Sequence, residues 1–407
     1  MNNFLLGVQE VRFALQPENP HQAKLLASLR LHGPQSAAEM AAQVGLSRSK
    51  IGQELQRLED LGFVERAGKA ESRGGRRSGL VQLSGDLRFV GVDIGATSLD
   101  VGVTNGRLDL VAHVAEDIDI RSGPDVVLRR AVELIGKLRA EGHLPRIDGV
   151  GVGVPGPVSF RDGYTVSPPI MPGWDRYPVR EFFLKQLDCP VLVDNDVNLM
   201  AVGEMYCGLA RSVGDFLFVK IGTGIGCGII TGHRVLRGSN GSAGDIGHIA
   251  VNDGGPVCSC GRTGCLEAWF SGAALSRDVN ALARGGESGV LESMLADGPL
   301  TAADVGTAMR QGDPHALGLV RDGGRRLGRV LAGLVNFFNP AMIVVGGGVA
   351  TGLGHTLLAE VRSELYRRST PLATSNLPVV LSELGENAGV VGAAALAGDH
   401  ALGVDQT

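Results

Sequence analysis

The most restrictive feature of this sequence is a group of cysteines in the segment from Gly244 to Glu267. Cys258, Cys260 and Cys265 fall within eight residues, and His248 lies ten residues before the first of them. Three thiolates and one imidazole, joined by tight glycine turns, are a ligand set typical of tetrahedral Zn²⁺. Because four protein ligands leave no position for a catalytic water, we predict a structural zinc site. The alternative is three buried free cysteines, since cysteine is among the residues most often buried.

Apolar, glycine-rich segments from Phe89 onward predict strands that run into tight turns. A glycine turn lets a phosphate approach the backbone closely, and a nearby carboxylate is a ligand for Mg²⁺. The candidates for such a nucleotide site lie in three turns: Asp93, Gly95, Thr97, Gly222, Thr223, Gly224 and Gly347. Turns of this kind are common, so the pattern alone also allows a purely structural role.

A predicted strand at 191–193 ends in the polar run Asp194, Asn195 and Asp196. Sheets of α/β proteins place their chemistry at the carboxyl ends of strands, which makes Asn195 and Asp196 candidate ligand-binding residues. The alternative is a capping cluster for the helix predicted over 197–206, because Asn and Asp are favoured at helix N-caps.

The N-terminal segment predicts a winged helix-turn-helix. Ser36 and Glu39 form a capping-box pattern for one short helix, Gly45 makes a turn, and Ser47 caps a second helix. Strands predicted at 61–64 and 80–83 flank a basic loop, which forms the expected wing. Recognition helices and wing arginines contact DNA grooves, and the candidates here are Ser47, Arg48, Ser49, Lys50, Gln53, Arg76 and Arg77. The alternative is a helical interaction module followed by a flexible linker.

Charge is distributed unevenly along the chain. Residues 1–88 carry 12 Lys and Arg against 9 Asp and Glu, whereas the remainder carries 26 against 34. Only the first part is therefore a candidate for contact with DNA phosphates. The sequence has neither a secretory leader pattern nor an apolar run long enough for a membrane span. Because cysteines grouped in a metal motif fit a reducing compartment, we expect a cytoplasmic protein with no membrane partner.

The glycine run from Gly222 to Gly228, Gly238, and the segment from Gly244 through the cysteines to Glu267 together resemble the signature of the ROK family of repressors, open reading frames and sugar kinases. The resemblance extends from Phe89 to the C-terminus. It implies an α/β fold with an N-terminal winged helix-turn-helix and a two-lobed, actin-like (ribonuclease-H-like) sugar kinase body that contains a structural zinc. We expect the DNA-binding domain and linker in 1–86, the first lobe in 87–198 with a helix at about 386–402, and the second lobe with the zinc motif in 199–385.

The resemblance also implies roles for individual residues. In the family's kinases the residue matching Asp196 accepts the proton of the sugar hydroxyl, so Asp196 is the catalytic candidate if this chain is a kinase. The implied sugar ligands are Asn195, Asp196, Asp245, His248 and Glu267, and the implied zinc ligands are His248, Cys258, Cys260 and Cys265. Asp245 stands where the family has Glu. Two further positions depart from the kinases, because Ile170 replaces a sugar-binding Asn and Ser98 stands where Lys or Asn is common.

Two functions are compatible with these features. Family members with a helix-turn-helix are sugar-responsive regulators, and this chain resembles the xylose-type and N-acetylglucosamine-type repressors. We then expect a homodimer or homotetramer that binds double-stranded DNA at a two-fold operator and changes its affinity when a sugar or sugar phosphate enters the cleft. The alternative is a sugar kinase that uses Mg²⁺ and ATP and carries an accessory DNA-binding domain. A zinc hydrolase is excluded, because protein ligands fill all four zinc positions.

Overall fold

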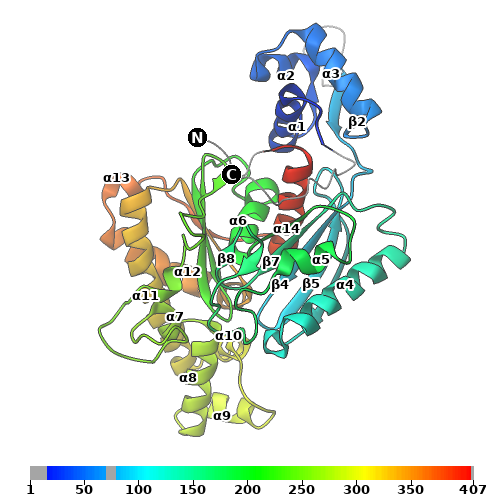
Figure 1. Ribbon diagram of the computed structural model, residues 1–407. Coiled ribbons are helices and arrows are strands. Elements are labelled where there is room, and N and C mark those ends of the chain that lie inside the picture. The colour runs from blue at the N-terminus through cyan, green and yellow to red at the C-terminus, as the bar shows by residue number, and fades with distance from the viewer. Residues whose placement is uncertain (1–15, 70–78, 405–407) are drawn as a thin grey trace, which may run out of the picture.

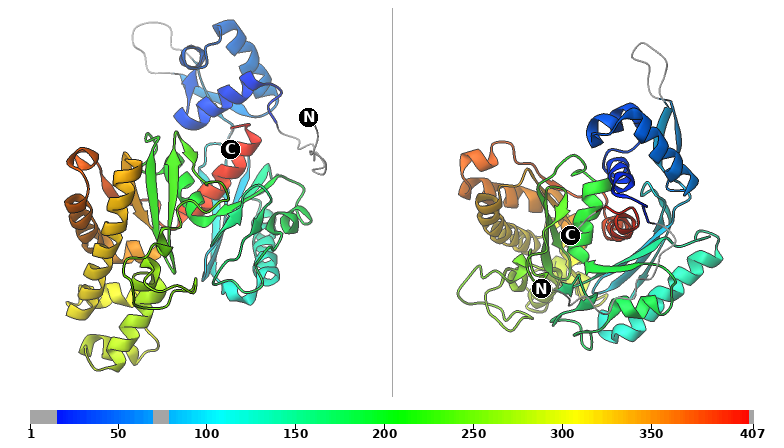
Figure 2. Two further views of the ribbon diagram at one scale, coloured as in Figure 1. Left: turned by 60° about the vertical axis from the view of Figure 1, so that its left-hand side comes forward. Right: turned by 45° about the horizontal axis from the view of Figure 1, so that its top comes forward.

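The computed structural model describes residues 16–69 and 79–404. An N-terminal domain lies at one end of a larger body, and the body consists of two lobes side by side (Figure 1, Figure 2). Each lobe is built on a five-stranded sheet. Among the residues described, no helix combines the length and the apolar character that a membrane crossing needs.

The N-terminal domain is a winged helix-turn-helix, as predicted. Its elements are α1 (Pro20–His32), β1 (Gln35–Ser36), α2 (Ala37–Val44), α3 (Arg48–Asp60), β2 (Val64–Lys69) and β3 (Gly79–Leu83). Strand β3 pairs antiparallel with both β1 and β2 and forms a small sheet beside the helices.

The predicted helix caps are confirmed. The Ser36 hydroxyl accepts from the Glu39 N–H while the Glu39 carboxylate accepts from the Ser36 N–H, which completes the capping box of α2. Gly45 ends that helix in the left-handed conformation, with φ of 72°. The Ser47 side chain then accepts from the Lys50 N–H at the start of α3.

The first wing strand begins later than the sequence predicted. Leu61 and Gly62 still donate their N–H groups to carbonyls in the last turn of α3, so these two residues end the helix. Strand β2 begins at Val64. The prediction of a strand at 61–64 was therefore wrong over most of its length, because apolar residues at a helix end satisfy the same short pattern.

The hydrophobic core of the N-terminal domain includes the last helix of the chain, α14 (Asn387–Ala401). Leu25 and Leu29 of α1 belong to one buried cluster with Ala397 and Ala401 of α14. In Figure 1, α14 rises from the body and ends beneath α1. The N-terminal domain is thus attached to the body through a shared core as well as through the chain itself.

The first lobe has the strand order β10-β7-β4-β5-β6. Its strands are β4 (Phe89–Ile94), β5 (Ser98–Thr104), β6 (Leu110–Asp117), β7 (Gly149–Val154) and β10 (Val191–Asn195), with a small hairpin of β8 (Val158–Ser159) and β9 (Tyr164–Thr165). Helices α4 (Pro124–Ala140) and α5 (Val179–Leu184) cover one face and α14 covers the other. At Gly91 an added Cβ would lie 1.9 Å from the Val390 carbonyl oxygen, so only glycine permits this approach of α14.

The second lobe has the strand order β13-β12-β11-β14-β15. Its strands are β11 (Phe216–Ile221), β12 (Ile225–Thr231), β13 (Arg234–Val235), β14 (Met342–Gly346) and β15 (Val379–Leu381). Its helices are α7 (Leu266–Trp269), α8 (Gly272–Arg284), α9 (Gly289–Leu295), α10 (Ala302–Arg310), α11 (Pro314–Phe338), α12 (Gly348–Arg368) and α13 (Pro371–Thr374).

The two sheets repeat one topology. In each lobe three consecutive antiparallel strands are followed by two strands parallel to the first of them. This duplicated arrangement confirms the actin-like fold. Helix α6 (Asp196–Cys207) packs against β11 and β12 of the second lobe and against α14, which in turn packs on β4 and β7 of the first. The two helices therefore lie between the sheets.

Candidate ligand cavity and metal centre

A cavity of about 640 Å³ opens between the lobes at the ends of the central strands. Its polar lining includes predicted residues from both lobes: Asn195, Asp196, Thr223, Asp245, His248 and Glu267. Ile170, the departure noted in the sequence, also lines it. Sequence reasoning missed three basic residues of the lining, namely Lys220, Arg262 and Arg277. A concave site with convergent polar groups is the expected form of a small-molecule site.

Asn195 caps helix α6 at the edge of this cavity. Its side-chain oxygen accepts from the N–H groups of Val197 and Asn198, and its amide donates to the Gly156 carbonyl at 2.9 Å. The capping role that the sequence left open is therefore present. The same contacts hold the amide in place at the cavity wall.

Asp196 forms an ion pair with a lysine of the opposite lobe. The Lys220 Nζ lies 2.5 Å from Asp196 Oδ2. Burial disfavours the ammonium, but the carboxylates of Asp196 and Asp93 outweigh it and raise the pKa of Lys220. In the sequence, the only indication of this ion pair was Lys220 itself, the single charged residue in the otherwise apolar strand β11.

Asp93 lies behind this pair at the end of β4. Burial, opposed by the ammonium of Lys220, raises the pKa of the Asp93 carboxyl to about 7. Its Oδ1 atom is buried without a hydrogen-bond partner. Gly389 of α14 is so close that an added Cβ would lie 1.8 Å from Asp93 Oδ2.

The three glycine turns of the sequence converge only in part on the cavity. Thr223 and Gly224 line it, whereas Gly95, Thr97, Gly222 and Gly347 are not among its lining residues. Gly347 is the N-cap residue of α12, with φ of 90°, and an added Cβ there would lie 2.6 Å from the Ile221 carbonyl oxygen. Gly224 leaves room for Glu267, whose Oε2 accepts from the Ile225 N–H at 3.0 Å.

Another aspartate of the polar run, Asp194, connects the lobes from a buried position. Its carboxylate accepts from Asn198 Nδ2 at 3.0 Å and from Arg237 Nε of the second lobe at 2.9 Å. Arg237 also lies over the ring of Phe160, 3.8 Å from the ring centroid. Such a stacked, paired guanidinium fixes the lobes beside the cavity.

The predicted zinc ligands come together at one side of the cavity. One donor atom from each of His248, Cys258, Cys260 and Cys265 lies within 4.8 Å of all the others. The Cys258 Sγ is 3.4 Å from His248 Nδ1, and Cys260 and Cys265 have their sulfur atoms 3.7 Å apart. This donor set and spacing fit a tetrahedral metal ion. The other imidazole nitrogen, Nε2, is 3.9 Å from Asp245 Oδ1.

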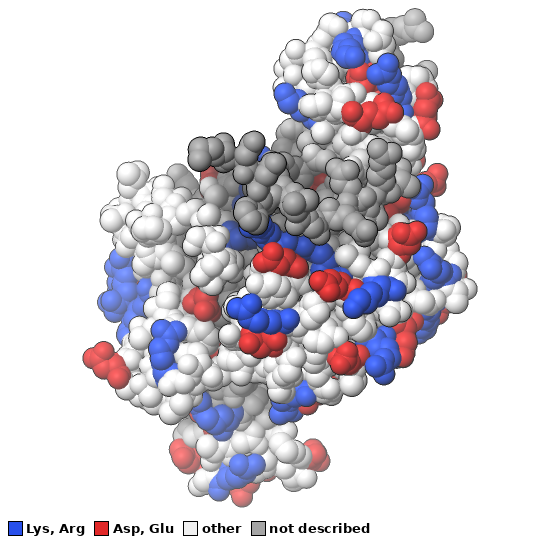
Figure 3. Space-filling model, in the orientation of Figure 1, with Lys and Arg blue, Asp and Glu red and all other residues white. Residues whose placement is uncertain are grey.

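The predicted DNA-contacting residues occupy the start of α3. Ser47, Arg48, Ser49 and Gln53 are exposed there, and Ser47 also serves as the helix cap. Lys50 pairs with the buried Glu54 at 2.6 Å. Arg76 and Arg77 lie outside the described residues. Figure 3 shows acidic side chains among the basic ones on this domain, in keeping with its small positive excess.

A buried polar cluster joins the N-terminal domain to the body, and sequence reasoning missed it. Arg30 of α1 donates from Nε to Asp399 Oδ1 of α14 at 2.9 Å, and the Tyr206 hydroxyl of α6 donates to Asp399 Oδ2 at 2.9 Å. Arg30 also donates to the carbonyls of Gly106 and Ala395. We call Arg30, Tyr206 and Asp399 the interdomain cluster. In the sequence, the indication of this cluster was Asp399, the one aspartate in a helix of mainly small and apolar residues.

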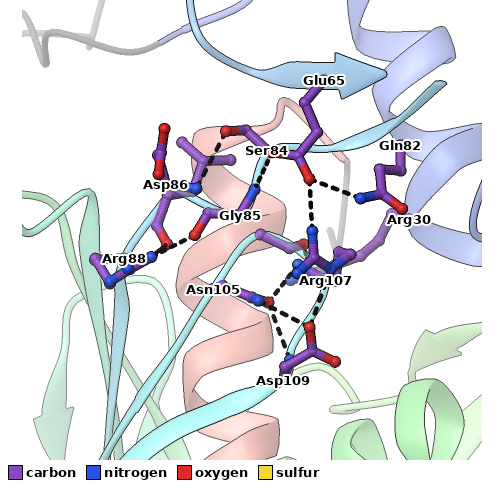
Figure 4. Close-up of polar contacts among 12 residues, drawn as sticks. Arg30, Glu65, Gln82, Ser84, Gly85, Asp86, Arg88, Asn105, Arg107 and Asp109 are labelled. Carbon is purple, nitrogen blue, oxygen red and sulfur yellow. Dashed lines mark hydrogen bonds and ion pairs between the residues drawn. The ribbon is translucent and has the colours of Figure 1, made fainter. Parts of the chain in front are cut away.

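A second contact between the two parts is exposed. Figure 4 shows Arg107 between Glu65 of β2 and Asp109 of the first lobe. Its guanidinium lies 2.7 Å from Glu65 Oε1 and 3.0 Å from Asp109 Oδ2. Glu65 also accepts from the Gly85 N–H, next to the chain segment that connects the domain to the body.

Fold and site together define a class of protein, an actin-like sugar-kinase body that carries a winged helix-turn-helix. The model of the ROK family matches residues 89–400, so this chain belongs to the ROK family. The model of the MarR family matches residues 19–73.

Known relatives include both kinases and repressors. A glucokinase of Halalkalibacterium halodurans is 33% identical over 315 residues, which cover 75% of this chain and 94% of that protein. The xylose repressor of Caldicellulosiruptor bescii is 29% identical over 364 residues, which cover 89% of this chain and 91% of that protein. The crystal structure of a ROK family transcriptional regulator, a homolog of the E. coli MLC protein, superposes with a TM-score of 0.79 at 26% identity and covers 94% of this chain and 95% of that one.

Proposed function

We propose that this chain is a sugar-responsive transcriptional repressor, whose winged helix-turn-helix binds an operator and whose interlobe cavity binds the sugar that releases it. The xylose repressor and the solved ROK transcriptional regulator align with 89% and 94% of this chain, which includes both the N-terminal domain and the body. The glucokinase aligns with 75% of the chain. This difference in coverage favours the regulator over the kinase.

One observation carries the proposal: helix α6 connects the cavity to the DNA-binding domain. It begins at Asn195 and Asp196, which line the cavity, and Tyr206 near its other end belongs to the interdomain cluster. A helix of 12 residues spans about 18 Å. A ligand that shifts the start of α6 therefore acts on the contact that holds Arg30. Each tenfold change in operator affinity requires a coupling free energy of about 1.4 kcal/mol.

Within this proposal, Asn195, Asp196, Asp245, His248 and Glu267 bind the sugar. His248 Nδ1, Cys258, Cys260 and Cys265 would hold a structural Zn²⁺, and the metal would fix the loop that carries Asp245 and His248. Removal of the metal with a chelator is expected to weaken sugar binding and to lower the melting temperature, with recovery on addition of Zn²⁺. A protein that contains no zinc by elemental analysis yet binds sugar would contradict this role.

The proposal further includes a symmetric oligomer. A two-fold operator requires two recognition helices about 34 to 36 Å apart, or a multiple of that distance. We therefore propose at least a homodimer, and sedimentation of the protein with and without operator DNA measures it. A monomer in both conditions would contradict this part of the proposal.

The function itself is tested by capture of DNA. Purified, zinc-loaded protein is incubated with sheared DNA of its own organism, alone and with a panel of hexoses, pentoses and amino sugars, and the retained fragments are sequenced. The expected result is a two-fold symmetric sequence whose recovery is lost with one sugar. Failure to enrich any sequence in every condition would contradict the proposal.

Variants separate the two binding activities. Arg48→Ala is expected to weaken operator binding about tenfold or more, as loss of a base contact does, and to leave sugar binding intact. Gln56→Ala, on the same helix and also exposed, is the matched control and is expected to bind normally. Asp196→Asn is expected to lose the response to sugar while it retains operator binding. Fluorescence anisotropy measures all three.

A sugar kinase is the second candidate, because Asp93 and Asp196 are both present and a glucokinase is 33% identical over 315 residues. Consumption of ATP with the same sugar panel tests it directly.

A further inference from the structure

Lys220 is a charged residue in a strand that is otherwise apolar. The remaining residues of β11 are buried hydrophobic side chains. Lys220 lies opposite Gly226 on β12 and Gly346 on β14, so neither cross-strand neighbour has a side chain that crowds it. The lysine therefore has room to extend along the end of the sheet, and it reaches the cavity.

Packing of α6 fixes the partner of this lysine. Val197 of α6 packs against Gly226, the β12 residue that lies opposite Lys220, since a Cβ added at Gly226 would be 2.8 Å from Val197 Cγ2. The adjacent Asp196 thus faces Lys220 across the two lobes, with Nζ and Oδ2 2.5 Å apart. The side chains retain only 21% and 5% exposure, respectively, so solvent screens this pair weakly.

Asp93 lies close to Asp196. A Cβ added at Gly153 would be 3.1 Å from Asp93 Oδ1 and 3.5 Å from Asp196 Cα, so both acids flank this one glycine. The positive charge of Lys220 acts on both carboxylates. Two carboxylates and one ammonium, from β4, α6 and β11, therefore lie near one another.

These residues do not fit a divalent cation beside Asp196. Mg²⁺ takes carboxylate oxygens as ligands and demands near-octahedral geometry with several waters. The Lys220 ammonium already occupies an oxygen of Asp196, and it would repel a doubly charged ion placed a few ångströms away. The Mg²⁺ site expected for a kinase is thus opposed by a residue of this chain.

We propose that Lys220 is the resident cation of the interlobe cavity, where its ammonium, paired with Asp196 and near Asp93, takes the place of a divalent metal ion. The cavity then binds its ligand without a divalent metal ion at this position. An ammonium has three N–H donors, so those not used by Asp196 remain for a ligand hydroxyl. That the ligand is a sugar rests on the function proposed above, whereas the exclusion of the metal does not.

The test uses Mn²⁺ as the probe, because free and bound ions are distinguished by electron paramagnetic resonance. The zinc-loaded full chain is titrated at a pH of about 8, where Asp93 is ionised. Wild type is expected to bind no Mn²⁺ at this site. Lys220→Met, which keeps the length of the side chain and removes its charge, is expected to gain one site at least about a hundredfold tighter.

Two controls make the assignment specific. Lys220→Arg keeps the charge and is expected to exclude Mn²⁺ as wild type does. The double variant Lys220→Met/Asp93→Asn removes one proposed ligand and is expected to lose the site that Lys220→Met gained. Circular dichroism verifies that each variant is folded.

Either of two results would overturn the proposal. The first is stoichiometric Mn²⁺ binding by wild type that Asp93→Asn or Asp196→Asn abolishes, and this measurement needs no lysine variant to fold. The second is a folded Lys220→Met that binds Mn²⁺ no better than wild type. Neither result depends on DNA or sugar, so a failure here is distinguishable from a failure of operator capture.

Discussion

The two ends of helix α6 are built in different ways. At its start, Asn195 and Asp196 line a cavity of about 640 Å³, and Asp93 nearby keeps a buried oxygen without a partner. At its far end, Tyr206 hydrogen-bonds Asp399, which also pairs with Arg30 in a buried site. The first end also has a charge pair, Asp196 with Lys220, but both residues line the cavity and Lys220 keeps 21% of its side chain exposed. The second end has its charge pair enclosed within the protein.

This difference indicates how a signal travels in the proposed repressor. Polar groups that face a cavity change partners when a ligand binds, whereas a buried charge pair tolerates little displacement before it breaks. A movement that begins at Asp196 therefore has its largest consequence at Arg30, where the DNA-binding domain is held. The predictions below test whether the two ends differ as described.

Removal of Arg30 is expected to have the largest effect. Arg30→Ala leaves the Asp399 carboxylate buried without its guanidinium partner, and breaking a buried ion pair in this way costs about 3 to 5 kcal/mol. Urea unfolding followed by circular dichroism measures the loss. A decrease below about 1 kcal/mol would mean that the cluster is no stronger than an exposed ion pair.

The pH dependence of stability distinguishes the cavity end of α6 from the interdomain cluster. Asp93 is buried against Lys220, Asp196 and Asp100, and its pKa is raised from 3.8 to about 7. A carboxyl with a raised pKa in the folded state stabilises the fold at low pH, and this contribution is lost as the pH rises from about 4 to 7.

The expected slope from this group is at most about 1.4 kcal/mol per pH unit, with stability decreasing as the pH rises. Asp93→Asn is expected to remove that part of the slope, as measured by urea unfolding between about pH 5 and pH 7. An unchanged pH dependence in this variant would show that Asp93 titrates normally.

The exposed contact between the domains is expected to contribute least. Arg107 and Glu65 have side chains that are 35% and 37% exposed, so Arg107→Ala is expected to cost about 0.2 to 1 kcal/mol. It is the matched counterpart of Arg30→Ala, because both arginines join the same two parts of the molecule. A cost equal to that of Arg30→Ala would remove the distinction between buried and exposed contacts.

Features with local signals could be predicted from the sequence. The helix predicted over 197–206 is present as α6, Asp196–Cys207, and the capping box of Ser36 and Glu39 forms as expected. The Cys and His residues converge because their spacing in the chain is short. The duplicated sheet topology came from resemblance rather than from periodicity, since buried strands of this kind lack a clear alternation.

The long-range pairs could not be predicted. Lys220 and Asp196 are separated by 24 residues, and Arg30 and Asp399 by 369. No local pattern links such residues, because their contact depends on how α6 and α14 pack between the sheets. Each left only a weak trace, a single charge within an apolar segment. The strand expected at 61–64 failed for a different, local reason, since hydrogen bonds to the last turn of α3 decided the backbone of Leu61 and Gly62.

The central claim is that α6 couples the cavity to the DNA-binding domain, and Tyr206→Phe tests it most directly. This change removes one hydroxyl from the interdomain cluster and leaves the Arg30–Asp399 pair in place. Operator affinity is measured by fluorescence anisotropy with and without saturating sugar, in wild type and in the variant. The account predicts that the variant binds operator and sugar separately but that the ratio of the two operator affinities moves toward one. A ratio equal to that of wild type would contradict it.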